Sequence, residues 1–325
     1  MTTQIERLSD TSDPTVRRYE DVRELLPDVA NPTPMVRLGR ILPHRRAYLK
    51  LEWMNPFGSV KDRAAAAMLG GLEARGELDG RALVEASSGN TAIALAALAA
   101  RLGMQIAVAV PDGVPEEKKV LLRMLGAEVW ETPDDLCPID HPKDGAIAVA
   151  RALAASEGGS RYVHVDQYEN ADNVRAHYET TGPEIWRQTD GTIRTFYAGL
   201  GTTGTVVGVG RFLKERDPSI RVVAIEPEPG HRLPGLKSFA ETKEPGILDR
   251  DVVDEVVMVP DGDAYAMTKR LFREEALIVG PSTGAVVHAM AADGGDLAVG
   301  ISPDSGTKYT SYFADVLGDE GIPPL

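Results

Sequence analysis

The hydrophobic positions of this chain fall into short apolar runs that alternate with longer amphipathic ones. In the first half, apolar runs typical of strands are separated by segments with helical periodicity. The expected strands are 47–53, 81–86, 105–110, 128–132 and 161–165, and the expected helices are 62–76, 91–103, 115–126 and 144–156. Because short apolar strands that alternate with helices form βαβ units, this half predicts a parallel sheet.

The second half repeats this alternation. The expected strands are 194–199, 221–227 and 297–302, and the expected helices are 204–216, 263–276 and 284–292. The chain is therefore expected to be an α/β protein with two open, twisted α/β domains. Residues 227–251 break the pattern because they are rich in proline, glycine and charge. A long irregular segment inside a compact domain is more often functional than idle.

Composition narrows the class of protein. The 325 residues include 35 basic and 49 acidic side chains, a net charge of −14, which argues against nucleic-acid binding through phosphate contacts. The single cysteine, Cys137, excludes an intrachain disulfide and a multi-cysteine metal site. His141, His164 and His177 show no metal-ligand spacing, so no metal is expected.

The N-terminal region is polar, and roughly the first 25 residues are expected to be flexible. It contains no apolar core of a signal peptide. No apolar run approaches the roughly 20 residues that span a bilayer, so we expect a cytoplasmic protein without membrane contact.

Lys61 stands where the turn-forming sequence NPFGSV meets a predicted helix. The helix macrodipole disfavours a cation in the first turn, so the amine is easier to deprotonate there. A neutral, desolvated amine is the form that makes a Schiff base. On this residue alone, an ordinary solvated lysine remains the alternative.

Three further turns lie between an expected strand and an expected helix. Residues 85–92, EASSGNTA, offer backbone N–H groups and hydroxyls that suit a carboxylate, although helix capping by Ser88 or Asn90 is equally consistent. Residues 199–205, GLGTTGT, suit a phosphate but match neither the Walker nor the dinucleotide motif, and a bare glycine-rich turn stays open. Ser282, in GPSTGA at 280–285, could cap a helix or hold a ligand atom.

Six motifs occur in one order along the chain. They are NPFGSVKDR (55–63), SSGNT (87–91), QYEN with TTGPEIW (167–186), GLGTTGT (199–205), GPSTGA (280–285) and PDSGTKY (303–309). Together they resemble the cysteine synthase and cystathionine β-synthase family of fold type II pyridoxal-phosphate (PLP) enzymes. The resemblance runs from residue 31 to residue 313 and is nearest to the O-phosphoserine and O-acetylserine sulfhydrylases.

The resemblance implies that PLP binds in a cleft between the two domains. Lys61 would be the catalytic residue and the attachment point of the cofactor. The other cofactor-binding residues would be Asn90 at the 3′-oxygen, Gly201, Thr202, Thr203, Gly204 and Thr205 at the phosphate, and Ser282 at the pyridine nitrogen. The residues that bind the substrate carboxylate would be Ser87, Ser88, Gly89, Asn90, Thr91 and Gln167.

The implied function is that of a PLP-dependent cysteine synthase. β-Elimination of an O-activated serine would give α-aminoacrylate, and sulfide would add to give L-cysteine, with Lys61 as the base for the α-proton. A serine near the ring nitrogen is a weaker partner than a carboxylate, which favours β-elimination over transamination. The expected partners are thus a small amino acid and sulfide or another thiol donor.

The donor stays open between O-phosphoserine and O-acetylserine. His231, Arg232 and Lys237 lie in the irregular segment, where Arg232 and Lys237 would bind the substrate phosphate, although a solvated basic loop is the alternative. The chain departs from common family motifs at Ala92 and Thr203, each in place of a glycine, and at Phe57, which could reshape the substrate pocket. Asp304 and Lys308 are expected to shape the pocket near the pyridine ring.

The sequence leaves two other functions open, namely a standalone cystathionine β-synthase and a non-catalytic PLP-binding sensor. The larger, PLP-anchoring domain is expected to comprise residues 1–54 and 170–325. Residues 55–169 are expected to form a smaller, mobile domain that closes on the substrate. The resemblance further implies a homodimer.

Overall fold

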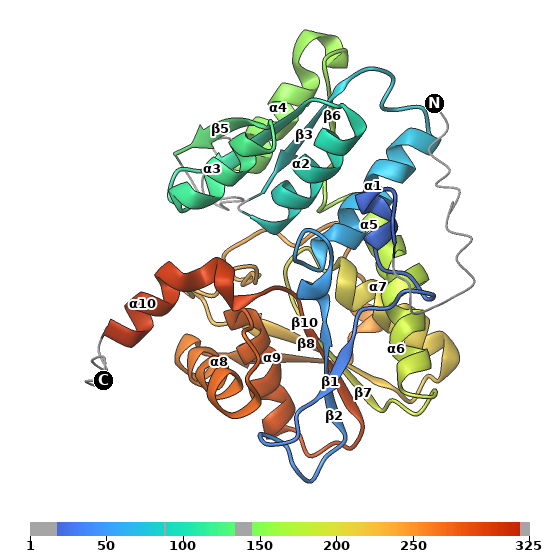
Figure 1. The fold of residues 1–325 in the computed structure, drawn as a ribbon, viewed down its shortest axis with the longest axis vertical. Coiled ribbons are helices and arrows are strands. Elements are labelled where there is room, and N and C mark those ends of the chain that lie inside the picture. Colours follow the sequence, from blue (N-terminus) through green and yellow to red (C-terminus); the bar gives the residue numbers. More distant parts are fainter. Residues whose placement is uncertain (1–17, 88, 134–144, 319–325) are drawn as a thin grey trace.

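Two α/β units lie one above the other (Figure 1). The computed structural model describes residues 18–87, 89–133 and 145–318. The small unit, in the upper part of the figure, has a four-stranded sheet in the order β5-β4-β3-β6, and the large unit has a six-stranded sheet in the order β1-β2-β10-β7-β8-β9. All neighbouring strands are parallel except β1 and β2, so the predicted α/β class is confirmed.

The elements follow one another as a run of βα units. The strands are β1 Met35–Arg37, β2 Ala47–Leu51, β3 Ala82–Ala86, β4 Ile106–Pro111, β5 Glu128–Thr132, β6 Tyr162–His164, β7 Thr195–Gly199, β8 Arg221–Pro227, β9 Glu255–Val259 and β10 Ala298–Ser302. The helices are α1 Lys61–Ala74, α2 Asn90–Leu102, α3 Glu116–Met124, α4 Ala146–Ala155, α5 Asp172–Ala176, α6 Gly182–Gln188, α7 Gly204–Arg216, α8 Asp261–Glu275, α9 Pro281–Ala292 and α10 Thr310–Gly318.

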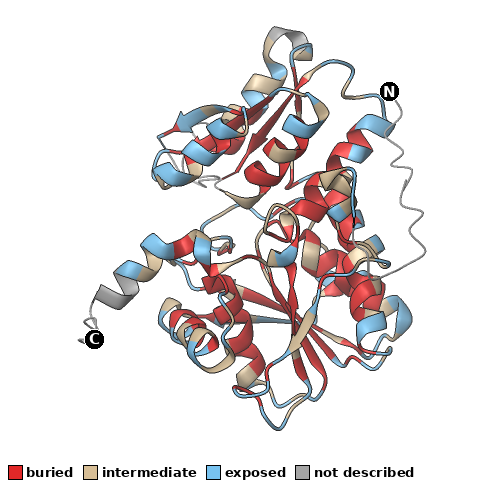
Figure 2. Cartoon of the chain, in the orientation of Figure 1, coloured by how far each residue is buried: buried red, intermediate tan, exposed pale blue. Residues whose placement is uncertain are grey.

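The sheet of the small unit is covered on both faces, and its inner strands β3 and β4 are accordingly apolar except for Glu85. Successive side chains of β3 point to opposite faces. Leu83 packs in one core with α1 and α2, whereas Val84 packs in another with α4. Every residue of β3 and β4 is buried (Figure 2).

Both faces of the large sheet are covered as well. Val286 and Met290 of α9 pack with Leu49 on one face, and Val206 of α7 packs with Phe196 on the other. Each sheet therefore packs its own hydrophobic core. The segments between the two sheets are not needed for either core and are available for a functional site.

Several elements have no counterpart among the expected ones. The polar segment 172–188 forms α5, a π-helical turn at His177–Thr181 and α6, whose helical periodicity is masked by Gly182 and a proline at the helix start. Strands β1 and β9 and helix α10 were not expected either. Within the N-terminal region predicted to be flexible, Val22–Leu25 form a 3₁₀ helix, and residues 1–17 lie outside the described residues.

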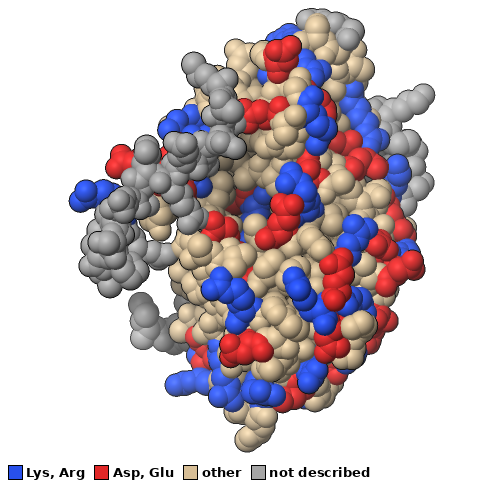
Figure 3. Space-filling view, turned by 90° about the vertical axis from the view of Figure 1, so that its right-hand side faces the viewer, with Lys and Arg blue, Asp and Glu red and all other residues tan. Residues whose placement is uncertain are grey.

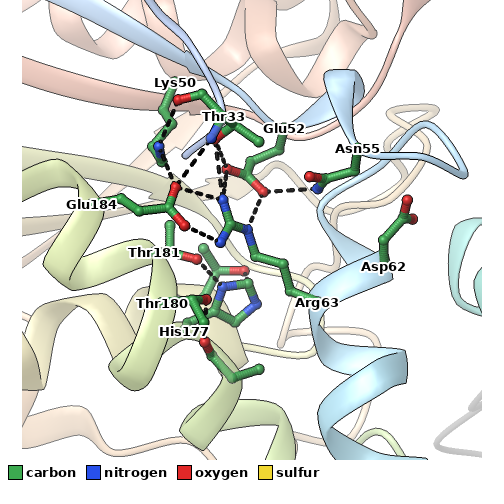
Figure 4. Close-up of polar contacts among 12 residues, drawn as sticks. Thr33, Lys50, Glu52, Asn55, Asp62, Arg63, His177, Thr180, Thr181 and Glu184 are labelled. Carbon is green, nitrogen blue, oxygen red and sulfur yellow. Dashed lines mark hydrogen bonds and ion pairs between the residues drawn. The ribbon is translucent and has the colours of Figure 1, made fainter. Parts of the chain in front are cut away.

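A buried ionic cluster fixes the start of α1. Arg63 Nε lies 2.7 Å from Glu52 Oε2, and Arg63 Nη1 lies 2.6 Å from Glu184 Oε1. Lys50 Nζ lies 2.7 Å from Glu184 Oε2, and all four side chains are shielded from solvent (Figure 4). The cluster joins β2, the 3₁₀ turn Glu52–Met54 and α6 to α1. Lys61, two residues before Arg63, is thereby held in place.

We expect Arg63→Leu to lower the free energy of unfolding by about 3–5 kcal/mol, because Glu52 and Glu184 lose a buried counter-charge. Urea denaturation followed by circular dichroism measures this loss. The control is Arg46→Gln, which breaks an exposed pair with Asp296 and should leave the unfolding midpoint unchanged. Equal losses in both variants would contradict a special role for the cluster.

Candidate functional site

A cavity of about 800 Å³ lies between the two units. Ser87, Gln167 and Gly201, which follow β3, β6 and β7, line it, so it lies at the carboxyl ends of parallel strands in both sheets. Ligands of open parallel sheets bind at that edge. The predicted site residues in its wall are Lys61, Ser87, Gly89, Asn90, Thr91, Gln167, Gly201, Thr202, Arg232 and Lys237.

Five predicted site residues are not in that wall. Thr203, Gly204 and Thr205 lie directly behind Thr202 at the start of α7, and Ser282 is buried in the first turn of α9. Ser88 lies outside the described residues, as do Cys137 and His141.

Lys61 is the first residue of α1 and reaches into the cavity. Its Nζ donates to Thr202 Oγ1 at 3.4 Å. Burial lowers the pKa of the Lys61 amine to about 8, and Asp304 partly offsets this effect. A large part of the Lys61 population is therefore neutral at mildly alkaline pH, as a nucleophile or base requires.

The loop before Lys61 is held by its neighbour Asp62. Asp62 Oδ2 accepts the Phe57 N–H at 2.6 Å, and its Oδ1 accepts the Ser59 hydroxyl at 3.2 Å. Phe57 packs against the core of the small unit and is not among the cavity-lining residues. The suggestion that Phe57 shapes the pocket thus finds no support in the geometry.

Asn90 is clamped by two residues from the C-terminal part of the chain. Its Nδ2 donates to Asp304 Oδ2 at 2.6 Å, and its Oδ1 accepts from Lys308 Nζ at 2.9 Å. Lys308 also donates to Gly58 O at 2.8 Å, and the Tyr309 hydroxyl donates to Asp304. These contacts fix the orientation of the Asn90 amide in the cavity wall.

The turn after β3 lines the cavity, and the N–H groups of Gly89 and Ala92 both donate to Ser87 Oγ at 3.2 Å. Thr91 Oγ1 donates to Gln167 Oε1 at 2.6 Å, and Gln167 Nε2 donates to Ala86 O at 2.9 Å and Glu85 Oε1 at 3.3 Å. The first α2 bond runs from Ile93 N–H to Gly89 O, so the earlier N–H groups have no partner inside the helix. The turn is suited to an anion.

The turn after β7 has the geometry of a second anion site. Thr203 has a φ of 68°, a left-handed conformation that glycine favours and that strains a β-branched residue. A Cβ on Gly201 would lie 2.7 Å from Gly235 O, and one on Gly204 would lie 2.1 Å from Asn173 Oδ1. The buried Thr203 Oγ1 has no hydrogen-bond partner within the described part of the chain.

His177, which the sequence did not single out for this site, supports that turn from below. Its Nε2 lies 3.2 Å from Thr205 Oγ1, and its Nδ1 lies 2.9 Å from Thr181 Oγ1. Burial lowers the pKa of His177 to about 3, so the ring is neutral and bridges the two hydroxyls. The π-helical turn that places it carries no recognisable sequence signal, although such turns are frequent at functional sites.

The structure also bears on metal binding and on membrane insertion. The residues that the structure describes contain no group of three or more His, Cys, Asp or Glu side chains arranged to hold a metal. Within the same residues, every helix falls short of the length and apolar character needed to cross a membrane.

The family model described as "Pyridoxal-phosphate dependent enzyme" matches residues 26–302. The chain belongs to this enzyme family. This PLP-dependent enzyme is 40% identical over 295 residues to "Cysteine synthase B" of Salmonella typhimurium, covering 89% of this chain and 94% of that one. It is 38% identical over 314 residues to "Cysteine synthase" of Aquifex aeolicus, covering 91% and 94%. The resemblance to cysteine synthases is therefore confirmed.

Solved structures show the same fold. The crystal structure of O-ureido-L-serine synthase superposes on this PLP-dependent enzyme with a TM-score of 0.84 at 33% identity, covering 94% of this chain and 98% of that one. O-acetyl serine sulfhydrylase isoform 3 from Entamoeba histolytica gives 0.81 at 28% identity, covering 92% of each. The prediction of a two-domain fold type II enzyme is confirmed.

Glu85, beneath the turn after β3, gives the enzyme a pH-dependent stability. Burial raises the pKa of this carboxyl from 4.5 to about 8, so at neutral pH it is protonated in the folded enzyme and ionised in the unfolded one. Raising the pH from 5 to 8 should destabilise the wild type relative to Glu85→Gln by up to about 1.4 kcal/mol per pH unit. Urea unfolding of both proteins across this range measures the difference. A difference that does not vary with pH would refute a protonated Glu85.

Proposed function

We propose that this enzyme is a cysteine synthase that makes L-cysteine from an O-activated serine and sulfide. The observation that carries the proposal is one cavity in which a lysine of lowered pKa, Lys61, faces two anion-binding turns. The cysteine synthases among its relatives support the same activity.

The residues present fit PLP. The Thr203 hydroxyl, buried without a partner among the described residues, and the N-terminus of α7 would take the cofactor phosphate with Gly201, Thr202, Gly204 and Thr205. Asn90, in the cavity wall, would bond to the 3′-oxygen, and Ser282 would face the ring nitrogen. His177 would hold Thr205 in place from behind.

PLP supplies an electron-withdrawing ring that stabilises negative charge at the substrate α-carbon. The protein supplies the proton transfer and the positioning. Lys61 would take the α-proton, because its amine is neutral for much of the time at a pKa of about 8. The β-substituent would leave, sulfide would add to the β-carbon, and Lys61 would return the proton.

The turn after β3 would bind the substrate carboxylate. Ser87, Ser88, Gly89 and Thr91 would supply N–H groups and hydroxyls there, and the Thr91 hydroxyl donates to Gln167 Oε1. A carboxylate at a helix N-terminus gains from both the N–H groups and the macrodipole. Holding this group orients the α-hydrogen toward Lys61.

The two separate sheets support a division of the chain into two domains. We propose that residues 55–169 close on a larger body of residues 1–54 and 170–325, which would exclude water from the cavity. The four-stranded sheet draws its strands from residues 82–164 and supports this division. The family resemblance supports a cytoplasmic homodimer.

Lys61→Ala tests the assignment of the base. We expect cysteine formation from O-acetylserine and sulfide to fall by about 10³-fold or more, because the proton acceptor is lost. Borohydride reduction followed by peptide mass spectrometry should label Lys61 with the cofactor in the wild type only. Substantial activity in a folded Lys61→Ala protein would reject the role, and a wild type that forms no cysteine from either donor would reject the function.

Arg232 and Lys237 lie on the irregular segment beside the cavity. Lys237 Nζ lies 4.9 Å from the centroid of the Tyr168 ring, and Arg232 is exposed at the mouth. If they receive a phosphate, Lys237→Ala or Arg232→Ala should raise KM for O-phosphoserine about tenfold and KM for O-acetylserine much less. Steady-state kinetics with both donors decide this, and equal effects would exclude a phosphate site.

A further inference from the structure

Lys118 is a cation in the cavity wall that has no role in the proposed mechanism. It lies in the first turns of α3 in the small unit and is half-buried. Its Nζ lies 5.0 Å from the centroid of the Tyr309 ring and 5.8 Å from that of Tyr312, both in the large unit. Within the described residues, the Lys118 amine has no hydrogen bond or ion pair.

The two tyrosines form a fixed platform for this amine. Their rings meet edge to face, with centroids 6.0 Å apart, and the Tyr309 hydroxyl is held by Asp304. The faces of aromatic rings attract a cation without neutralising its charge. Lys118 is thus held at the cavity with its amine open to another group, although burial lowers the pKa of this amine and Asp304 only partly offsets that effect.

Lys118 has charged neighbours of both signs, since Asp304 and Glu117 raise the pKa of its amine and Lys308 lowers it. A Cβ on Gly89 would lie 3.8 Å from Lys118 Nζ, so the amine faces the N-terminus of α2, which carries positive partial charge. Arg232 lies close enough to Tyr312 to oppose the rise in the phenol pKa that burial causes. Lys118, Arg232 and the start of α2 thus bring positive charge to one end of the cavity, where an anion would be bound favourably.

The surface of the enzyme does not share this bias. Its net charge is −14, and Figure 3 shows acidic and basic side chains interspersed on the side that carries α5 and α6. The charged residues of the cavity wall are instead mainly basic: Lys61, Lys118, Arg232 and Lys237 against Asp112 and Glu241. Glu241 already accepts the Gly230 N–H at 2.8 Å. The excess positive charge is therefore local to the cavity.

We infer that Lys118 is a specificity-determining residue that binds the anionic side-chain group of the donor, the phosphate of O-phosphoserine, from the side opposite the irregular segment. This inference rests on the proposed function. The donor carboxylate already has the N–H groups and hydroxyls of the turn after β3, whereas a dianionic phosphate requires cations. Lys118 from the small unit and Arg232 from the large unit would then both contact one phosphate.

The test compares two donors on the PLP-loaded, full-length enzyme. In Lys118→Met, the ratio of kcat/KM for O-phosphoserine to kcat/KM for O-acetylserine should fall by about tenfold or more, since a charge-assisted bond is lost. Lys118→Arg should keep the ratio within about threefold of the wild type. The control Arg123→Gln removes a positive charge from the same helix at an exposed pair with Glu116 outside the cavity wall, and should leave the ratio unchanged.

Calorimetric titration of O-phosphoserine and O-acetylserine into the same proteins separates this inference from the proposed function. Even if the enzyme forms no cysteine, Lys118→Met should weaken O-phosphoserine binding about tenfold and O-acetylserine binding much less. Equal weakening of both would assign Lys118 to the carboxylate or to the packing of the two units, and no weakening would assign it no role in binding. Either result overturns the inference.

Discussion

The guanidinium group of Arg63 is the contact on which the geometry of the cavity depends. It is buried between the carboxylates of Glu52, in the 3₁₀ turn before α1, and Glu184, in α6, and Lys50 completes the neutralisation. Burying four charges is tolerable only when every partner is in place, so the cluster admits one arrangement of the chain. That arrangement sets the first turn of α1, and hence the position of the Lys61 amine at the cavity.

Because of this cluster, the start and the later turns of α1 are held by different units. Its first turn is fixed to the large unit through Arg63, whereas Met68 and Leu72 further along pack into the core of the small unit. The helix is therefore shared by the two units. The closing motion proposed for the small unit would have to take place around α1, because the residues that position Lys61 cannot move without separating buried charges.

The sequence sufficed for those parts of the site that are local. Lys61, the turn at 87–91 and the turn at 199–205 are each contained in one strand–turn–helix unit, so the residue types predict the geometry directly. The alternation of apolar runs likewise predicted most strands, because both sheets are covered on two faces. The helices of the polar segment 172–188 were not predicted, since the helical run is interrupted by a π turn and contains few apolar positions.

The parts of the site built from distant segments could not be foreseen in the same way. Asp304 and Lys308 were expected near the cofactor, but their hydrogen bonds to Asn90 join segments that lie more than two hundred residues apart in the chain. His177 carries no local motif, and its partner Thr205 lies in another βα unit. Lys118 reads as an ordinary surface lysine of an amphipathic helix until the fold brings Tyr309 and Tyr312 over it.

The close approach of Gly201 to Gly235 has a consequence for how such an enzyme could change its donor. The irregular segment is fastened to the turn after β7, through the 2.8 Å bond from Lys237 N–H to Leu200 O and through a contact that tolerates no side chain at Gly201. The loop that would select the donor and the turn that would bind the cofactor are therefore structurally coupled. A loop transplanted from an enzyme of different preference would have to bring its matching turn with it, so these two segments would have to be exchanged as a pair.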